Sequence, residues 1–191
     1  MRLGVLDNGQ SFGDKALFAF IRAVSRQPTP EILKLLAYRP DFLGNFLKRV
    51  THEVMRGRSA WSVGDRELMA AVVSQANECA FCIGAHTAVA ARAYGDRAKV
   101  DRALAANPDA GEPLRATLVL LRKLARERTV DAADMRAALA AGATRAQLED
   151  ALAVGFAFNT MNRLADAFGF AVPAPEVFAA SAKFLLWRGY R

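Results

Sequence analysis

The chain has few reactive side chains: among 191 residues there are two cysteines, Cys79 and Cys82, and two histidines. No second CxxC pair and no HxxxH pair follows, although structural zinc sites usually close with four ligands drawn from two such pairs. The sequence therefore predicts neither a metal site nor a cofactor. Zinc stays open as the competing interpretation, because two cysteines and one histidine are good zinc ligands.

Long apolar runs are also missing. The most apolar stretch, residues 151–161, has about half the length of a membrane-spanning helix. The first residues lack a continuous apolar core and include Asp7 and Asp14, which argues against a signal peptide. Two close cysteines with no others are typical of a redox pair rather than a disulfide scaffold. We therefore expect a cytoplasmic protein with no membrane partner.

Runs of strand-forming residues are scarce, while alanine is abundant and hydrophobic residues make up 53% of the chain. This composition predicts an all-α fold. A length of 191 residues suits one domain, and no fixed-period repeat is present. We expect a single helical domain over residues 1–191 with three parts: an N-terminal helical layer at about 14–55, a redox core at about 64–170 and a C-terminal helix at about 176–187.

The formal net charge is +7, which raises the question of nucleic-acid binding. The densest basic group is Arg122, Lys123, Arg126 and Arg128, but apolar residues and Glu127 interrupt it at helical spacing. Such a pattern is typical of a solvated helix face. A basic motif interleaved with aromatic residues is absent, so we expect no nucleic-acid partner.

The most informative segment is residues 78–86, which holds both cysteines and His86. On a helix, Cys79, Cys82 and His86 are spaced three and four residues apart and project from one face. A cysteine at or near the start of a core helix lies by unpaired N–H groups, which favour the reactive thiolate. A nearby imidazole can accept a thiol proton. The alternative interpretation is that the two cysteines and His86 only pack in the core.

Glu67 lies twelve positions before Cys79, early in a helix that we expect to begin near Ser62 or Gly64. A return helix through Cys79 to residue 94 would bring Glu67 and the cysteines together as an αα-hairpin. A partly buried carboxyl group has a raised pKa that suits proton transfer at neutral pH. The alternative is an ordinary first-turn acid that complements the helix dipole.

Together these motifs resemble the alkylhydroperoxidase AhpD-like family of the carboxymuconolactone decarboxylase-like superfamily, and within it the uncharacterised peroxidase-related branch. The resemblance spans about residues 39–170 and is clearest over 64–95. It is carried by Glu67, the twelve-residue step, the Cys79-Ala80-Phe81-Cys82 pair, His86, the lead-in residues Ser74, Ala76 and Asn77, and the segment 158–166.

The resemblance implies an all-helical fold and subunits that associate into homodimers, trimers or hexamers. It also implies a thiol-dependent peroxidase that reduces hydrogen peroxide or organic hydroperoxides and takes electrons from an unknown thiol or dithiol reductant. By the same resemblance, Cys82 is the peroxide-reactive thiol, Cys79 the resolving thiol, and Glu67 with His86 the proton relay. Asn159, Asn162 and Arg163 are expected to be structural or interface residues.

This sequence departs from some family members, which carry a histidine immediately before the second cysteine, where Phe81 stands here. That difference bears on substrate and efficiency rather than on the dithiol itself. Two other functions stay open. One is a non-enzymatic, oligomeric redox sensor whose CxxC pair changes the assembly state. The other is a lactone decarboxylase of the carboxymuconolactone type, which does not require the CxxC pair.

Overall fold

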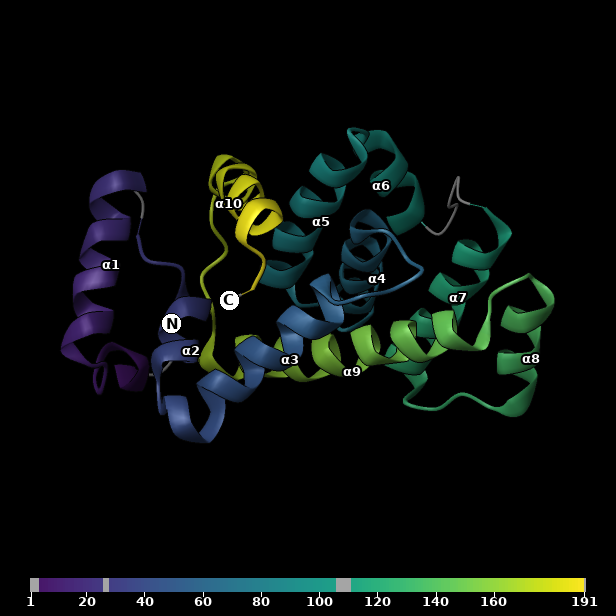
Figure 1. The fold of residues 1–191 in the computed structure, drawn as a ribbon, viewed down its shortest axis with the longest axis horizontal. Helices are drawn as coiled ribbons and strands as arrows, with labels where there is room; N and C mark the ends of the chain where they lie inside the picture. Colours follow the sequence, from purple (N-terminus) through teal and green to yellow (C-terminus); the bar gives the residue numbers. More distant parts are fainter. Residues whose placement is uncertain (1–3, 26–27, 106–110, 191) are drawn as a thin grey trace.

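A computed structural model describes residues 4–25, 28–105 and 111–190, and all regular structure in these ranges is helical (Figure 1). The predicted all-α fold is confirmed. A 3₁₀ turn (Gly4–Asp7) precedes α1, and a π-helical turn (Pro40–Gly44) precedes α3. The α-helices are α1 (Phe12–Ser25), α2 (Glu31–Ala37), α3 (Asn45–Arg56), α4 (Val63–Ala76), α5 (Ala80–Tyr94), α6 (Arg97–Leu104), α7 (Glu112–Glu127), α8 (Ala132–Ala140), α9 (Arg145–Phe168) and α10 (Pro175–Arg188).

The helix ends follow the capping residues that the sequence indicates. Ser62 and Thr144 form capping boxes at the starts of α4 and α9, and Gly95 ends α5 in the left-handed conformation. The chain from Pro40 to Gly44 forms a π-helical turn that leads into α3, and α9 continues past Asn162 to Phe168.

Helix α4 is the centre of the core. It packs against α3, α5, α6, α7 and α9, and the segment from Leu68 to Val73 is fully buried. A helix that is apolar on most of its circumference avoids water only when neighbours cover every side, which explains this central position. In Figure 1 the long α9 runs beneath α3 and α4, and α5 lies beside α4.

Helix α5 packs against both α4 and α10. The approach of α10 is close at Gly84, where a Cβ atom would collide with the ring of Phe178. A glycine is therefore needed at this contact for steric reasons. The same helix begins directly after Cys79, so the CxxC pair lies at the start of a core helix, as predicted.

The N-terminal part of the chain lies to one side of this core (Figure 1). Leu6 and Leu35 are fully buried and belong to the apolar cluster that contains both cysteines. Helix α1 exposes Phe12 and Phe20, which are 89% and 65% accessible. Across the described ranges, every helix is too short or too polar to cross a membrane.

Gly84→Ala provides a test of the contact between α5 and α10. Alanine favours a helix more than glycine does, but here its methyl group would overlap the Phe178 ring. We expect the free energy of unfolding in urea to fall by about 1–3 kcal/mol, the usual effect of overpacking. In a Phe178→Ala background the same substitution should cost less, because the overlap is gone. A stabilised single variant would contradict this packing.

Candidate redox site

The chain makes a tight turn just before the CxxC pair. Helix α4 ends at Ala76, and Glu78 takes the left-handed conformation with φ +60°. The turn is closed by the Cys79 N–H, which donates to the Ser74 carbonyl oxygen at 3.0 Å. Cys79 then serves as the N-cap of α5, while Glu78 is exposed. The predicted position of the cysteines at a helix start is confirmed.

Cys79 and Cys82 are free thiols buried side by side, with 0% and 6% of their surfaces exposed. Hydrogen bonding to the Cys82 thiol, together with a hydrogen bond from the Cys82 backbone N–H, lowers the pKa of Cys79 against the effect of burial. Interaction with Cys79, together with burial, raises the pKa of Cys82 well above its ordinary range. The two thiols thus ionise as a pair in which Cys79 carries the first negative charge.

An amide network lies against this thiol pair and consists of Ser74, Asn77, Asn159 and Asn162. Asn162 is fully buried, donates to the Ser74 hydroxyl at 3.0 Å and accepts from the Asn77 side chain at 3.0 Å. Asn77 also donates to Asn159 at 2.8 Å. A hydrogen bond from Asn162 opposes the rise in the Cys82 pKa. Asn162 is therefore a donor to the second sulfur as well as a link between α4 and α9.

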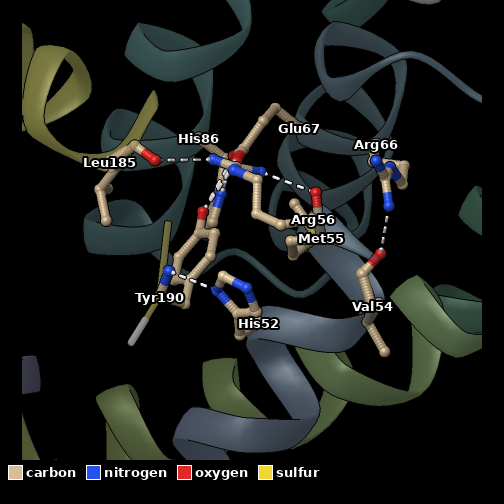
Figure 2. Close-up of polar contacts among 9 residues, drawn as sticks. All are labelled: His52, Val54, Met55, Arg56, Arg66, Glu67, His86, Leu185 and Tyr190. Carbon is tan, nitrogen blue, oxygen red and sulfur yellow. Dashed lines mark hydrogen bonds and ion pairs between the residues drawn. The ribbon is translucent and has the colours of Figure 1, made fainter. Parts of the chain in front are cut away.

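The other half of the site is a buried carboxylate with three donors, which we call the Glu67 cluster: Arg56, Glu67, His86 and Tyr190 (Figure 2). Glu67 Oε2 lies 2.7 Å from His86 Nδ1, and Oε1 lies 2.7 Å from Arg56 Nη2. The Tyr190 hydroxyl donates to both oxygens, at 2.9 and 3.1 Å. The cluster thereby joins α3, α4, α5 and the C-terminal end of the chain.

The raised pKa expected for Glu67 is wrong. Burial alone would raise it, but hydrogen bonding and charge from His86 and Arg56 hold the pKa of Glu67 below its ordinary value. Nor is Glu67 a first-turn acid, a role that Asp65 takes in α4. A carboxylate that stays ionised only accepts hydrogen bonds, so His86 Nδ1 carries the proton of this contact, and Nε2 is the ring nitrogen that does not bind Glu67.

The structure thus joins the four predicted site residues in two groups, Glu67 with His86 and Cys79 with Cys82. His86 follows Cys82 by one turn of α5, and its ring packs edge-on against Phe158 at 4.2 Å between centroids. Within the described part of the chain, no direct hydrogen bond connects His86 to either thiol. No group of three His, Cys, Asp or Glu side chains there is arranged to hold a metal ion.

Sequence reasoning missed Arg56 and Tyr190. Arg56 lies in a segment that the pattern indicates only as a polar break, and Tyr190 is more than a hundred residues from Glu67 in sequence. Phe81, which differs from some relatives, has a packing role: its ring contacts Phe170 and Phe178 edge-on at 5.3 and 5.8 Å between centroids. No local spacing signals the Tyr190 contact, because it depends on where α10 ends.

Comparison with known proteins supports the same interpretation of this segment. Residues 43–123 match the Carboxymuconolactone decarboxylase family, and this range contains both cysteines, Glu67 and His86. Tyr190 and the amide-network residues of α9 lie outside the match. None of the curated proteins matches the sequence.

Several solved structures share the fold. An uncharacterized peroxidase-related protein from Silicibacter sp. TM1040 is 24% identical, with a TM-score of 0.76 over 91% of this chain and 92% of that one. A second peroxidase-related protein, described as an alkylhydroperoxidase AhpD core from Ralstonia eutropha JMP134, is 22% identical, with a TM-score of 0.74 over 89% of each chain. The debrominase Bmp8, solved as a cysteine-to-alanine variant with 2,3,4-tribromopyrrole, is 17% identical, with a TM-score of 0.69 over 91% of this chain and 95% of that one.

The protein has the AhpD-like helical fold that these solved structures share. Within this fold, the segment that carries both cysteines, Glu67 and His86 is the one that matches the Carboxymuconolactone decarboxylase family.

The shared ionisation of the thiols gives a direct prediction. In Cys82→Ala the pKa of Cys79 should rise, because the carboxyl-terminal thiol no longer donates to its thiolate. In Cys79→Ala the pKa of Cys82 should fall, because the neighbouring sulfur that opposes its ionisation is gone. The ultraviolet absorbance of the thiolate, followed against pH, measures both. Glu78→Gln changes an exposed neighbouring charge and is the control. Unchanged titrations in both cysteine variants would show that the thiols ionise independently.

Proposed function

We propose that this protein is a thiol-dependent peroxidase, a dithiol–disulfide oxidoreductase that reduces hydrogen peroxide or organic hydroperoxides. The observation that carries the proposal is the pair of hydrogen-bonded, buried thiols at the N-terminus of α5, where a thiolate is stabilised. Two sulfurs that already share one proton need little movement to form a disulfide. The peroxidase-related neighbours add support at the level of the fold.

In the proposed reaction, the Cys79 thiolate takes the proton of Cys82 as the Cys82 sulfur attacks one peroxide oxygen and the O–O bond breaks. Cys82 becomes a sulfenic acid, and the leaving oxygen takes a proton to form an alcohol or water. The Cys79 sulfur then attacks the sulfenic sulfur, the S–O bond breaks, and water leaves as the disulfide forms. In total, two thiols and one hydroperoxide give one disulfide, one alcohol and one water. An external thiol or dithiol restores both thiols.

Accessibility favours Cys82 as the attacking sulfur. Cys82 retains 6% exposure, whereas Cys79 is fully enclosed, and such limited access suits a small oxidant. Cys79, the more acidic thiol, can accept the Cys82 proton across their hydrogen bond and later attack as the resolving sulfur. His86, oriented by Glu67, would exchange the remaining proton with the leaving oxygen.

Peroxide consumption and mass spectrometry test this function together. Wild type given one equivalent of peroxide should lose two hydrogens and form the Cys79–Cys82 disulfide. Cys82→Ser should lose turnover, while Cys79→Ser should stop at a sulfenic acid or mixed disulfide. Glu78→Gln, outside both groups of site residues, should retain the wild-type rate. Peroxide consumption by Cys82→Ser at the wild-type rate would refute the mechanism.

Other results of the same experiment would favour the competing functions. A reversible disulfide that changes the assembly state, with consumption no faster than a free thiol, would indicate a redox sensor. Turnover of a carboxymuconolactone by the double-serine variant would indicate a lactone decarboxylase. Thiol-dependent loss of bromide from 2,3,4-tribromopyrrole, the compound bound by Bmp8, would assign the dithiol to dehalogenation.

We also propose that the protein is a homo-oligomer of two, three or six subunits. A groove of about 640 Å³ on α9 is lined by apolar residues, including Phe156 at 60% exposure, and by the expected interface residues Asn159 and Arg163. A second copy of the chain can cover an exposed apolar face of this kind at a small cost in free energy.

Light scattering with size exclusion measures the oligomeric state. Wild type should elute as a dimer, trimer or hexamer, and Phe156→Glu should lower its mass, because a charge would be buried in the interface. Lys183→Glu on α10, an exposed residue outside this groove, should leave the mass unchanged. A monomeric wild type at micromolar concentration would refute the assignment.

A further inference from the structure

Tyr190, next to the C-terminal residue, contacts the carboxylate beneath His86. Its hydroxyl lies within hydrogen-bond distance of both Glu67 oxygens, and its ring is stacked against the His86 imidazole at 27° between planes and 6.4 Å between centroids. Burial, together with the adjacent Glu67 charge, raises the pKa of Tyr190 well above its ordinary value. The hydroxyl therefore stays protonated and remains a donor to Glu67.

The backbone after α10 is shaped to direct Tyr190 inward (Figure 2). Gly189 has φ +72°, and a Cβ atom there would lie 2.7 Å from His52 Nδ1, so no other residue fits easily. The Tyr190 N–H donates to the same His52 nitrogen at 3.3 Å. This contact fixes the chain end against α3 and leaves the tyrosine ring facing Glu67.

Arg56 connects the same two regions. Its Nη2 atom donates to Glu67 and also, at 3.2 Å, to the Leu185 carbonyl oxygen in the last turn of α10. Its guanidinium carbon lies 5.0 Å from the centre of the Tyr190 ring. Arg56 thus supplies the countercharge for a fully buried carboxylate and holds the C-terminal helix beside it.

We propose that Tyr190 and Arg56 are positioning residues, which fix the Glu67 carboxylate as a permanent hydrogen-bond acceptor for His86. The effect of this positioning on catalysis rests on the proposed function. Glu67 then resembles the orienting aspartate of a Ser-His-Asp triad rather than a proton carrier. The acceptor holds the imidazole in one tautomer and one orientation, and the proton transferred in the reaction moves through His86 Nε2.

The His86 Nδ1 proton reports this arrangement without any assay of activity. Bonded to a buried carboxylate, it should give a downfield proton NMR signal that exchanges slowly with water and disappears in His86→Gln. Tyr190→Phe keeps the aromatic packing and removes only the hydroxyl donor, so we expect exchange to become at least about tenfold faster. Tyr94→Phe is the matched control, because that hydroxyl donates to Asp65 instead.

A second pair of variants tests Arg56 in the same way. Arg56→Lys keeps a positive charge and should preserve the signal partly, whereas Arg56→Met should lose it. Folding of each variant is checked by its circular dichroism. Tyr190→Phe with wild-type exchange would overturn the proposal, as would an Arg56→Met protein that is folded and keeps the signal. If Tyr190→Phe does not fold, the two Arg56 variants decide the outcome.

Stopped-flow oxidation of the thiols separates this inference from the proposed function. With an active wild type, we expect Tyr190→Phe to react with peroxide about tenfold more slowly and Tyr94→Phe to react normally. A lost signal with an unchanged rate would overturn the positioning role. If wild type itself reacts no faster than a free thiol, the peroxidase function fails, and the NMR comparison alone decides whether Tyr190 and Arg56 position His86.

Discussion

The buried charge of Glu67 is the constraint on which the arrangement of the site depends. A carboxylate with no exposed surface is tolerated only where opposite charge and hydrogen-bond donors surround it. Arg56, His86 and Tyr190 provide these groups from α3, α5 and the C-terminal end. Three separate segments therefore contribute donors to one ionised group on α4. Residues far from the thiols in sequence thereby become part of the site.

The ionisation of the thiol pair depends on other residues than the Glu67 cluster. The pKa values of Cys79 and Cys82 depend on the interaction between the two thiols, on burial and on the nearby Asn162 and Asp166, whereas the Glu67 cluster acts on His86. The two groups are joined by a single turn of α5 between Cys82 and His86. The pKa values of the two thiols are therefore set without Glu67, whose carboxylate binds the imidazole instead.

Much of the fold could be predicted from local sequence. Helix starts at Ser62 and Thr144 are set by capping boxes, and the end of α5 is set by Gly95, because these contacts involve residues only a few positions apart. The contact between Glu67 and His86 could also be predicted, because an αα-hairpin brings their helices together. The ionised state of Glu67 could not be predicted, because it depends on Arg56, which comes close to Glu67 only in the folded chain.

The sequence by itself determined the helical class, the position of the dithiol at a helix start and the one-turn spacing to His86. These features depend on backbone periodicity, on capping and on the dipole at a helix end, all of which act over a few residues. Only the tertiary structure decided that Glu67 is fully buried and ionised, that Asn162 faces Cys82 and that Tyr190 completes the carboxylate's donors. Those properties depend on burial and charge compensation, which arise when distant helices pack together.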